Sequence, residues 1–475
     1  MSLRYRAVLL AVLAWLCASL AWADTRLVKD IVQGTGSGAP TQLVNIDGVL
    51  YFQARNDDGG PELWRSDGTR AGTRLVKDIF PGSIGSRPAS FVVHRGRIYF
   101  IAGGEDGDEL WVTDGTAAGT EQVTDINPGS GDSLLRFAAA DDFWRPAMIS
   151  VGRWLFFAAD DGESGFELWR SDGTEAGTKR VKDIFRGPDS GIEAPRFAAV
   201  GDTLFLFAKN NTNQGIELWK SDGTARGTVL VEPINDVPGD SAFPNPLDTD
   251  GILAATSTHV FFRGFDGTHY GLYASDGLNV TRLLETAPSN ISSPNFLDGL
   301  TVWRDLLYFR ADWKDLGPEL WVSDGTPAGT RVLSQFGNER LSTIRNTTEF
   351  VPSGGFLYFG CDPGDRVRYG QELCRTDGTT EGTGLVRDIQ PGSGFSSPSE
   401  FVDVEGILYF TARTDDLGIE LYRSDGTREG TYLAEDLLEG STPGNPVQLT
   451  TLGRRLVFTY NDREHGVEMH RFCCD

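Results

Sequence analysis

The hydrophobic positions of this chain fall in short runs of β-branched and aromatic residues, which polar turns separate, and no helical periodicity is present. In one stretch, Ser90–His94 and Arg97–Ile101 are such runs, and Arg95-Gly96 joins them as a tight hairpin would. A loop leads on to Glu109–Thr113, and a DGTAAG turn leads to Glu121–Ile126. The pattern therefore predicts a unit of four β-strands, called a, b, c and d in chain order.

The c strand and the turn after it recur along the chain. Pro61–Lys77 has the sequence PELWRSDGTRAGTRLVK, which returns as FELWRSDGTEAGTKRV at Phe166 and IELWKSDGTARGTVLV at Ile216. The central c-strand residue occurs nine times, at Leu63, Leu110, Leu168, Leu218, Leu272, Leu320, Leu373, Leu421 and Met469. Strands with apolar residues on both faces must be covered on both sides. Repeated four-stranded sheets of this kind predict an all-β propeller; a β-solenoid is the alternative, although its coils are usually shorter.

The two ends of the chain predict how the ring closes. The ninth unit ends the chain at Val467–Asp475 and has no d strand of its own. Thr25–Ile31, however, repeats the d-strand sequence of Thr73–Ile79. We therefore expect a single closed propeller of nine blades, in which the amino-terminal strand pairs into the last blade. Closure removes exposed sheet edges, and nine blades exceed the typical four to eight.

Residues 1–23 have the features of a secretory signal peptide. Two arginines precede the apolar run Ala7–Leu20, and Ala21-Trp22-Ala23 supplies the small residues of a cleavage site. A lipoprotein signal at Cys17 is the less favoured alternative, because Leu16 precedes it. No later apolar run is long enough to cross a bilayer. We expect residues 24–475 to form the propeller domain of a secreted or periplasmic protein.

The charge of the chain excludes some partners. The net charge of −24 becomes −26 when the signal peptide is removed, which argues against nucleic acid and anionic membranes as partners. We expect no cofactor, with calcium as an alternative because several b–c loops carry paired acids. These pairs are Asp57-Asp58, Glu105-Asp106, Asp160-Asp161 and Asp415-Asp416, and none follows the spaced D-x-D-x-D-G pattern.

The acids of the repeated motif are interpreted as structural. The aspartate of SDGT begins the c–d turn, where its side chain can accept backbone N–H bonds and the next glycine allows a positive φ. The glutamate of ELW begins a buried strand and needs a partner. A backbone N–H, a Thr hydroxyl or an Arg of the adjoining blade would serve. Because the glutamate recurs in eight units, a catalytic role, which one residue could fill, is less favoured.

Two cysteines are predicted to form a disulfide. Alignment of the units places Cys361 where other b strands have a small residue, such as Ala54. Cys374 stands where other c strands have a tryptophan, such as Trp64. Neighbouring b and c positions of one blade meet the geometry of a disulfide, so we predict a Cys361–Cys374 bond. The pairing of Cys473 and Cys474 is left open.

The signatures of enzymes and metal sites are missing. The five histidines are scattered without the spacing of metal ligands, and no C-x-x-C pair is present. The chain has neither a G-x-S-x-G elbow nor a phosphate-binding loop. We therefore name no catalytic residue and no metal ligand. Propeller catalytic residues can be spread over several blades, so an enzyme is not excluded.

The recurring E-L-W-x-x-D-G-T core, with its flanking A-G-T, covers nearly all of the mature chain. In this the chain resembles the bacterial ELWxxDGT repeat proteins. The resemblance implies an exported bacterial protein with a propeller-like fold, and it implies no activity. The chain departs from the motif at Gly271–Gly277, at Cys374 and in the last unit.

Functional residues are expected on the face that carries the b–c and d–a loops, because the long insertions lie there and variable loops on a rigid scaffold tend to bind ligands. The best candidates are Phe143, Trp144 and Arg145, although they could instead cover a blade edge. We expect a secreted, non-catalytic binding or scaffold protein that recognises an extracellular protein or polysaccharide. The alternative is an extracellular polysaccharide hydrolase or lyase with a site in the central channel.

Overall fold

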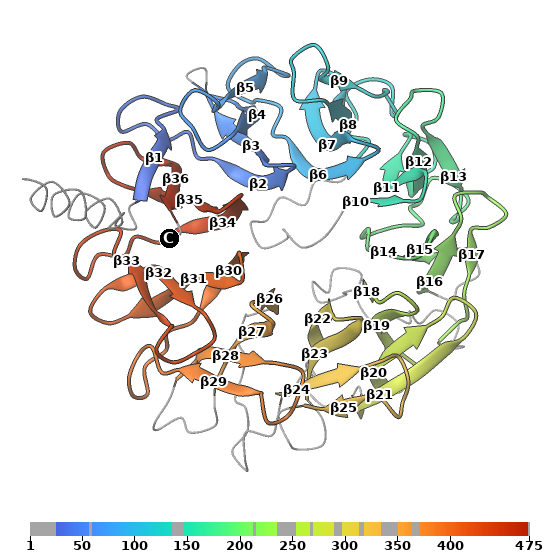
Figure 1. The fold of residues 1–475 in the computed structure, drawn as a ribbon. Coiled ribbons are helices and arrows are strands. Elements are labelled where there is room, and N and C mark those ends of the chain that lie inside the picture. Colours follow the sequence, from blue (N-terminus) through green and yellow to red (C-terminus); the bar gives the residue numbers. More distant parts are fainter. Residues whose placement is uncertain are drawn as a thin grey trace, which may run out of the picture.

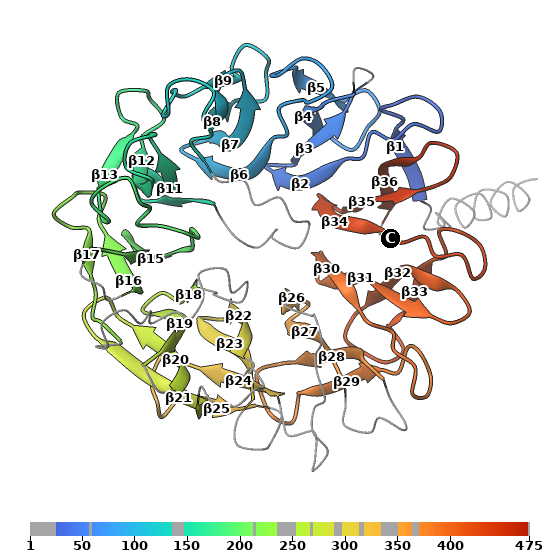
Figure 2. The same cartoon turned by 180° about the vertical axis from the view of Figure 1, so that it is seen from behind.

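A computed structural model shows that the chain forms a closed ring of nine β-sheets, each with four strands (Figures 1 and 2). It describes residues 25–56, 59–134, 147–211, 215–234, 253–266, 269–288, 297–312, 318–333, 350–362 and 370–473. Within these ranges every regular element is a strand. The predicted nine-bladed propeller is therefore confirmed.

In blades 1 to 8 the four strands pair antiparallel in chain order, and the first strand lies nearest the centre of the ring; in blade 9 the order from the centre outward is β34, β35, β36 and β1. Blade 1 has β2 (Thr41–Ile46), β3 (Val49–Arg55), β4 (Pro61–Ser66) and β5 (Arg74–Lys77); blade 2 has β6 (Ala89–His94), β7 (Arg97–Gly104), β8 (Gly107–Thr113) and β9 (Glu121–Gln122); blade 3 has β10 (Met148–Val151), β11 (Trp154–Asp160), β12 (Phe166–Ser171) and β13 (Lys179–Lys182). Blade 4 has β14 (Phe197–Val200), β15 (Thr203–Lys209), β16 (Ile216–Ser221) and β17 (Val229–Leu230); blade 5 has β18 (Leu253–Ala255), β19 (Val260–Phe265), β20 (His269–Ser275) and β21 (Val280–Pro288); blade 6 has β22 (Leu297–Trp303), β23 (Leu306–Asp312), β24 (Pro318–Ser323) and β25 (Arg331–Val332). Blade 7 has β26 (Val351–Ser353), β27 (Phe356–Cys361), β28 (Glu372–Thr376) and β29 (Gly384–Arg387); blade 8 has β30 (Ser399–Val404), β31 (Ile407–Thr414), β32 (Gly418–Ser424) and β33 (Tyr432–Glu435); blade 9 has β34 (Val447–Leu452), β35 (Arg455–Asn461), β36 (Val467–Cys473) and β1 (Thr25–Lys29).

Some outer strands are shorter than the sequence predicts. In blade 2 the d strand was expected over Glu121–Ile126, but β9 covers Glu121–Gln122. Val123 still donates to the carbonyl of Leu110 at 2.8 Å. The pairing therefore continues by single hydrogen bonds as the chain bends away from the sheet.

The ends of the chain close the ring as predicted. β1 pairs antiparallel with β36, so that Thr25 lies opposite Phe472 and Arg26 opposite Arg471. Both views place β1 on the outer side of β36, in the last blade. The residues that begin the described chain thus supply the fourth strand of blade 9.

The hydrophobic core lies between blades, because each c strand alternates its side chains between two interfaces. Leu63 packs with Phe100 and Ile98 in the interface between blades 1 and 2. The next residue, Trp64, packs on the other side of its blade, with Val28 and Met469 of blade 9. Nine such clusters, one per interface, are present in the described residues. The interfaces rather than single blades therefore stabilise the ring.

The SDGT aspartate forms the c–d turn, as predicted. Asp67 Oδ1 accepts the N–H of Thr69 at 2.9 Å and its hydroxyl at 2.6 Å. The Thr69 hydroxyl lowers the pKa of Asp67 most strongly, since it donates to the charged form. A Cβ on Gly72 would lie 2.0 Å from Asp67 Oδ1, which explains the second glycine of the motif. The hydroxyls of Ser66 and Thr73 meet at 2.7 Å and join the two strands beneath the turn.

Basic side chains of one blade hold the c–d turn of the next. Arg65 donates to the carbonyl of Gly115 at 3.2 Å, and Lys77 donates to that of Thr120 at 2.7 Å. The same two contacts close the ring: Arg471 donates to Gly68 at 3.1 Å, and Lys29 donates to Thr73 at 2.8 Å. The closing interface is therefore built like the one between blades 1 and 2.

The ELW glutamate binds the loop that leads from its own blade to the next. Glu62 accepts the N–H groups of Ile79, Phe80 and Ser86 at 2.9, 3.3 and 2.8 Å, and the Ser86 hydroxyl at 2.5 Å. The sequence left three partners open for this glutamate: a backbone N–H, a Thr hydroxyl or an Arg of the adjoining blade. In blade 1 the partners are backbone N–H groups and a Ser hydroxyl. Burial raises the pKa of five such glutamates to about 7: Glu109, Glu167, Glu372, Glu420 and Glu468.

Side chains near the centre of the ring join blades 8, 9 and 1. Gln448 Oε1 accepts the N–H of Gln42 at 3.1 Å, and Glu400 Oε2 accepts that of Gln448 at 2.8 Å. All three residues have a positive φ, between 55° and 60°. Left-handed backbone of this kind is costly for non-glycine residues, so these hydrogen bonds stabilise a strained inner edge beside the ring closure.

Cys361 and Cys374 form a disulfide, with Cα atoms 5.8 Å apart. The cysteines are diagonal neighbours, because Cys374 pairs with Phe359 and Cys361 pairs with Glu372. Both lie in the core between blades 6 and 7.

The double variant Cys361→Ala/Cys374→Ala should lose about 3 kcal/mol of unfolding free energy, because the bond closes a short loop in the unfolded chain. Urea unfolding of this variant measures the loss, and Cys473→Ser is the matched control. A double variant as stable as the parent would contradict the prediction.

Candidate functional site

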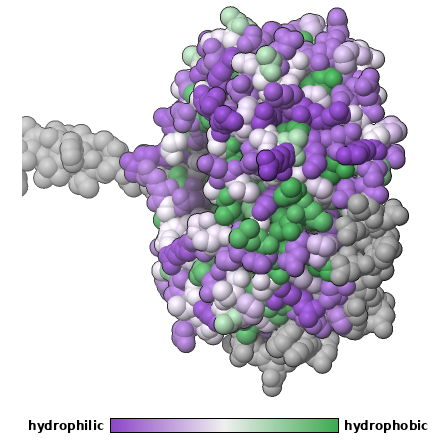
Figure 3. Space-filling view, turned by 90° about the vertical axis from the view of Figure 1, so that its right-hand side faces the viewer, coloured by the Kyte–Doolittle hydropathy of each residue, from purple (hydrophilic) through white to green (hydrophobic). Residues whose placement is uncertain are grey.

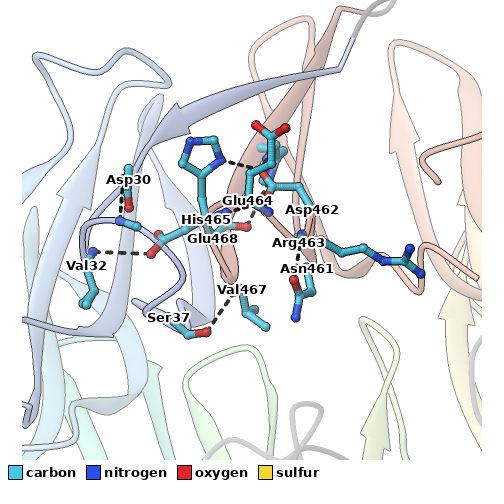
Figure 4. A network of polar contacts seen from close by, with 12 residues as sticks. Asp30, Val32, Ser37, Asn461, Asp462, Arg463, Glu464, His465, Val467 and Glu468 are labelled. Atoms are coloured by element: carbon cyan, nitrogen blue, oxygen red, sulfur yellow. Dashed lines mark hydrogen bonds and ion pairs between the residues drawn. The ribbon is translucent and has the colours of Figure 1, made fainter.

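The loops that were expected to carry function leave one face of the ring, because antiparallel strands place the b–c and d–a loops on the same side. The predicted patch Phe143, Trp144 and Arg145 lies outside the described residues. On this face we identify a polar cluster in the b–c loop of blade 9, between β35 and β36 (Figure 4). It is named the Asp462 cluster and consists of Asp462, His465 and His470.

Asp462 is fixed in place by the backbone of its own loop. Its Oδ1 accepts the N–H groups of Glu464 at 3.0 Å and His465 at 2.7 Å. Burial raises the pKa of Asp462, but these N–H groups and the nearby histidines outweigh it and lower the pKa on balance. The side chain is therefore a carboxylate at neutral pH, and its second oxygen faces two imidazole rings.

His465 contacts this second oxygen, with Nδ1 2.8 Å from Asp462 Oδ2 (Figure 4). The hydrogen bond that His465 Nδ1 donates to Asp462 raises the pKa of His465 above its ordinary value. Because Nδ1 donates to the carboxylate, Nε2 of the neutral ring is the basic nitrogen. The side chain is 31% exposed, and in the described residues Nε2 has no hydrogen-bond partner. The arrangement is that of a histidine base oriented by an acid.

His470 lies behind this pair and is buried. Its Nε2 is 3.3 Å from Asp462 Oδ2, and its Nδ1 is 3.1 Å from the carbonyl oxygen of Glu468. Its ring lies against that of Tyr460, with centroids 4.3 Å apart. Burial lowers the pKa of His470. The neutral ring has one N–H, so it can donate either to Asp462 Oδ2 or to the Glu468 carbonyl. Only the protonated ring can donate to both.

The sequence carries a signal for this cluster in the alignment of the repeated units and not in any single motif. In the aligned units His470 stands where Trp64 stands in blade 1, and Tyr460 stands where Ala54 stands. These are the two columns that predicted the disulfide of blade 7. The histidines were interpreted as scattered because only their spacing along the chain was considered, whereas pairing of β35 with β36 brings the b–c loop and the strand together.

In the b–c loop of blade 3, Asp161 of the pair Asp160-Asp161 binds groups of the protein itself. Asp161 Oδ1 accepts the N–H of Glu163 at 3.1 Å and that of Ser164 at 2.9 Å, and its Oδ2 lies 3.1 Å from Arg180. Across the described ranges, no three His, Cys, Asp or Glu residues are grouped so that they could hold a metal ion. The alternative of calcium therefore stays a prediction.

The rim of the ring carries a second surface feature. Seen from the side of β13 and β17, a group of hydrophobic residues interrupts a largely hydrophilic surface (Figure 3). Elsewhere, a hollow of about 330 Å³ lies between the c–d turns of blades 4 and 5, and Val229, Phe205 and Leu278, which is 75% exposed, line it. Lys220 and Asp222 also line it, but Lys220 already donates to the carbonyl of Gly277 at 2.6 Å. Because its lysine is already hydrogen-bonded, we do not assign a catalytic or ligand-binding role to this hollow.

The described part of the chain contains no helix that is long and apolar enough to span a membrane.

The fold places the chain among closed β-propellers, with the Asp462 cluster on the loop face. No family model matches the sequence, and no curated protein matches it. Solved structures are similar in fold. The crystal structure of puromycin hydrolase is 12% identical with a TM-score of 0.37, and the match covers 93% of this chain and 61% of that one. A structure from a study of two prolyl endopeptidases is 12% identical with a TM-score of 0.41, and covers 79% of this chain and 54% of that one. An acylaminoacyl peptidase of Pyrococcus horikoshii is 10% identical with a TM-score of 0.34, and covers 82% and 59%.

These comparisons correct the predicted function. The similar structures are described as a puromycin hydrolase, a prolyl endopeptidase and an acylaminoacyl peptidase. We predicted instead a non-catalytic protein that recognises an extracellular protein or polysaccharide, with a polysaccharide hydrolase or lyase as the alternative. Both predictions are wrong by this comparison. This chain spans 61% or less of the length of these three structures, and at such low identities the likeness shows the fold alone.

Proposed function

We propose that this chain hydrolyses an acyl bond by general-base catalysis, with His465 as the base and Asp462 as its positioning residue. The contact of 2.8 Å between Asp462 Oδ2 and His465 Nδ1 carries the proposal, because it directs the basic Nε2 of a partly exposed ring away from the carboxylate.

In this reaction Nε2 accepts a proton from a water molecule whose oxygen attacks the acyl carbon. The bond from that carbon to the leaving nitrogen or oxygen then breaks, and the imidazolium returns the proton to the leaving atom. Asp462 stabilises the imidazolium, and its own position is held by the N–H groups of Glu464 and His465. We assign water as the nucleophile, because in the described residues no serine, threonine or cysteine side chain hydrogen-bonds to His465; the nearby Ser37 hydroxyl accepts the N–H of Val467 at 3.0 Å.

The test is hydrolysis of p-nitrophenyl acetate and of a panel of peptide p-nitroanilides by residues 24–475. Activity should rise with pH as His465 loses its proton, and His465→Gln should lower kcat/KM by at least about 100-fold. His269→Gln, a change in blade 5, should leave kcat/KM unchanged. Asp462→Asn should move the acidic limb of the pH profile to lower pH, since the residue that raises the His465 pKa is gone. A wild-type protein inactive on every substrate, or an active His465→Gln variant, would refute the proposal.

We propose further that the chain is an exported member of the ELWxxDGT repeat proteins. The support is the repeated motif and the signal-like sequence of residues 1–23. Cell fractionation should recover the protein outside the cytoplasm with Asp24 as its first residue. Protein found only in the cytoplasm, with Met1 intact, would contradict export.

A further inference from the structure

A hollow of about 320 Å³ opens between blades 8 and 9, beside the loop that carries the Asp462 cluster. Its apolar wall is formed by Pro443, Val447, Tyr460 and Val467. Val447 is 43% exposed, although it is a large apolar residue. The volume suits one amino-acid side chain with its backbone, at the lower end of the range for small-molecule sites.

The polar groups of the hollow are hydrogen-bond donors. Arg463 lines it, and the guanidinium extends away from the Asp462 cluster (Figure 4). In the described chain this guanidinium has no ion-pair partner. Asn445 and Asn461 also line the hollow, and Asn461 Oδ1 accepts the N–H of Arg463 at 2.9 Å. The amide NH₂ of Asn461 is therefore left for a ligand.

The backbone places Arg463 there at a cost. Its φ of 71° lies in the left-handed region, which a long side chain adopts rarely and which is often retained where it serves a function. The hydrogen bond to Asn461 compensates for part of this strain. The geometry thus holds a charged donor and an amide donor on one short segment at the mouth of an apolar hollow.

The charge of the hollow is unusual for this protein. The chain has a net charge of −24, yet an arginine and no acid line this hollow. Acids line two other hollows of the described structure, namely Asp222 and Asp276 in one and Glu232 and Asp266 in the other. Two acids flank Arg463 in sequence. Asp462 turns its carboxylate to the two histidines, and within the described residues Glu464 forms no ion pair with Arg463.

We infer that this hollow binds the carboxyl terminus of a peptide whose last side chain is apolar. Arg463 forms a charge-assisted hydrogen bond with the terminal carboxylate, Asn461 donates to it as well, and the last side chain packs on Val447 and Tyr460. This binding site does not require that the chain is an enzyme. The expected ligand has one carboxylate beside one apolar side chain. The carboxylate complements the donors of Arg463 and Asn461, and the side chain complements the apolar wall.

The experiment is calorimetric titration of the His465→Gln protein with N-acetyl-Ala-Leu and with its carboxy-terminal amide. Because His465 is absent, failure of the proposed hydrolysis does not affect this test. The free acid should bind at least about 10-fold more tightly than the amide, since the charged partner is lost in the amide. Arg463→Gln should abolish this preference, and Val447→Asp should prevent binding of the acid by repulsion. Arg428→Gln, an exposed arginine of the opposite face, is the matched control and should change nothing.

Equal affinity for acid and amide would overturn the inference, as would a preference for the acid that survives Arg463→Gln. The absence of binding by both ligands at millimolar concentration would overturn it too. The preference should also weaken at high salt, because an exposed ion pair is screened.

Discussion

Removal of residues 25–31 from a protein of residues 24–475 is expected to abolish cooperative folding. These residues are β1 and the start of the loop after it, and they supply the outer strand of blade 9. Without them Val28 and Ile31 are lost from the core between blades 9 and 1, and the Lys29 contact with Thr73 is lost as well. The buried carboxylate of Glu468 also loses the N–H of Ile31, and the loop that carries its other donors, Val32 and Gly38, is no longer anchored by a strand. A buried charge without partners is strongly destabilising.

Circular dichroism and thermal scanning of the truncated protein measure this effect. We expect no cooperative transition, or aggregation, where residues 24–475 show one. The point variant Val28→Asp tests the same interface with the whole chain present. It should lower the free energy of unfolding by more than about 3 kcal/mol, because it buries an unpaired charge. Deletion of residues 474–475 is the control for a shortened terminus. A truncated chain that melts at the temperature of the parent would show that β1 does not close the ring.

Glu372→Ala is the second substitution with a large expected effect. Its carboxylate accepts the N–H groups of Ile389 at 2.8 Å and Ser396 at 3.2 Å, and the Ser396 hydroxyl at 2.7 Å. Removal leaves the N–H groups of Ile389 and Gln390 without this acceptor and opens space in the core, while Ser396 keeps its hydrogen bonds to the Gln371 carbonyl. Each unpaired donor costs about 1–3 kcal/mol, so the variant should lose at least about 2 kcal/mol. Glu381→Gln, an exposed glutamate in the same blade, should be neutral in the same urea titration.

The same glutamates predict how stability depends on pH. Burial raises the pKa of Glu109, Glu167, Glu372, Glu420 and Glu468 to about 7, against an ordinary value of about 4.3 in the unfolded chain. Between these values the folded protein binds more protons than the unfolded one, so the unfolding free energy falls as the pH rises. The buried histidines His94 and His470 have lowered pKa values and oppose this trend below about pH 6.5.

Thermal scans at pH 5 and pH 8 check this dependence. The melting temperature should be higher at pH 5, and Glu372→Gln should reduce the difference between the two. A melting temperature that rises from pH 5 to pH 8 would show that the backbone N–H groups outweigh burial and keep these glutamates charged.

The architecture could be predicted well from the sequence because the same strands and turns are encoded by similar residues in every repeat. Asp67 and Gly72 follow from turn geometry alone, and the duplicate of the d strand at Thr25–Ile31 was enough to predict the closure. The Cys361–Cys374 bond followed from comparison of two columns in the aligned units. In each of these cases the relevant partners lie within one blade or in the same position of every blade.

The contacts between blades were harder to predict from the sequence. Arg65 and Lys77 are ordinary exposed-looking residues of their strands, and their acceptors are backbone carbonyls about 40 to 50 residues away. A carbonyl is present at every residue, so the sequence does not mark which one is used. The partner of the ELW glutamate was left open for the same reason, because backbone N–H groups carry no signature.

The candidate site depended on a departure from the repeat rather than on the repeat itself. His470 and Tyr460 replace a tryptophan and an alanine of the usual blade, and the exchange brings an imidazole to Asp462. A single sequence shows such an exchange only when its columns are compared one by one. The expected patch at Trp144 rested instead on loop length and aromatic content, which indicate exposure but not chemistry.

The most direct test of the site is the titration of the five histidines by NMR in the protein labelled at histidine. His465 should titrate above the ordinary value of about 6.5, because Asp462 stabilises its charged form, and Asp462→Asn should lower its pKa. His94 and His470 should titrate below that value, because both are buried. A His465 pKa at or below the ordinary value, unchanged in Asp462→Asn, would show that the pair does not form and would remove the proposed base.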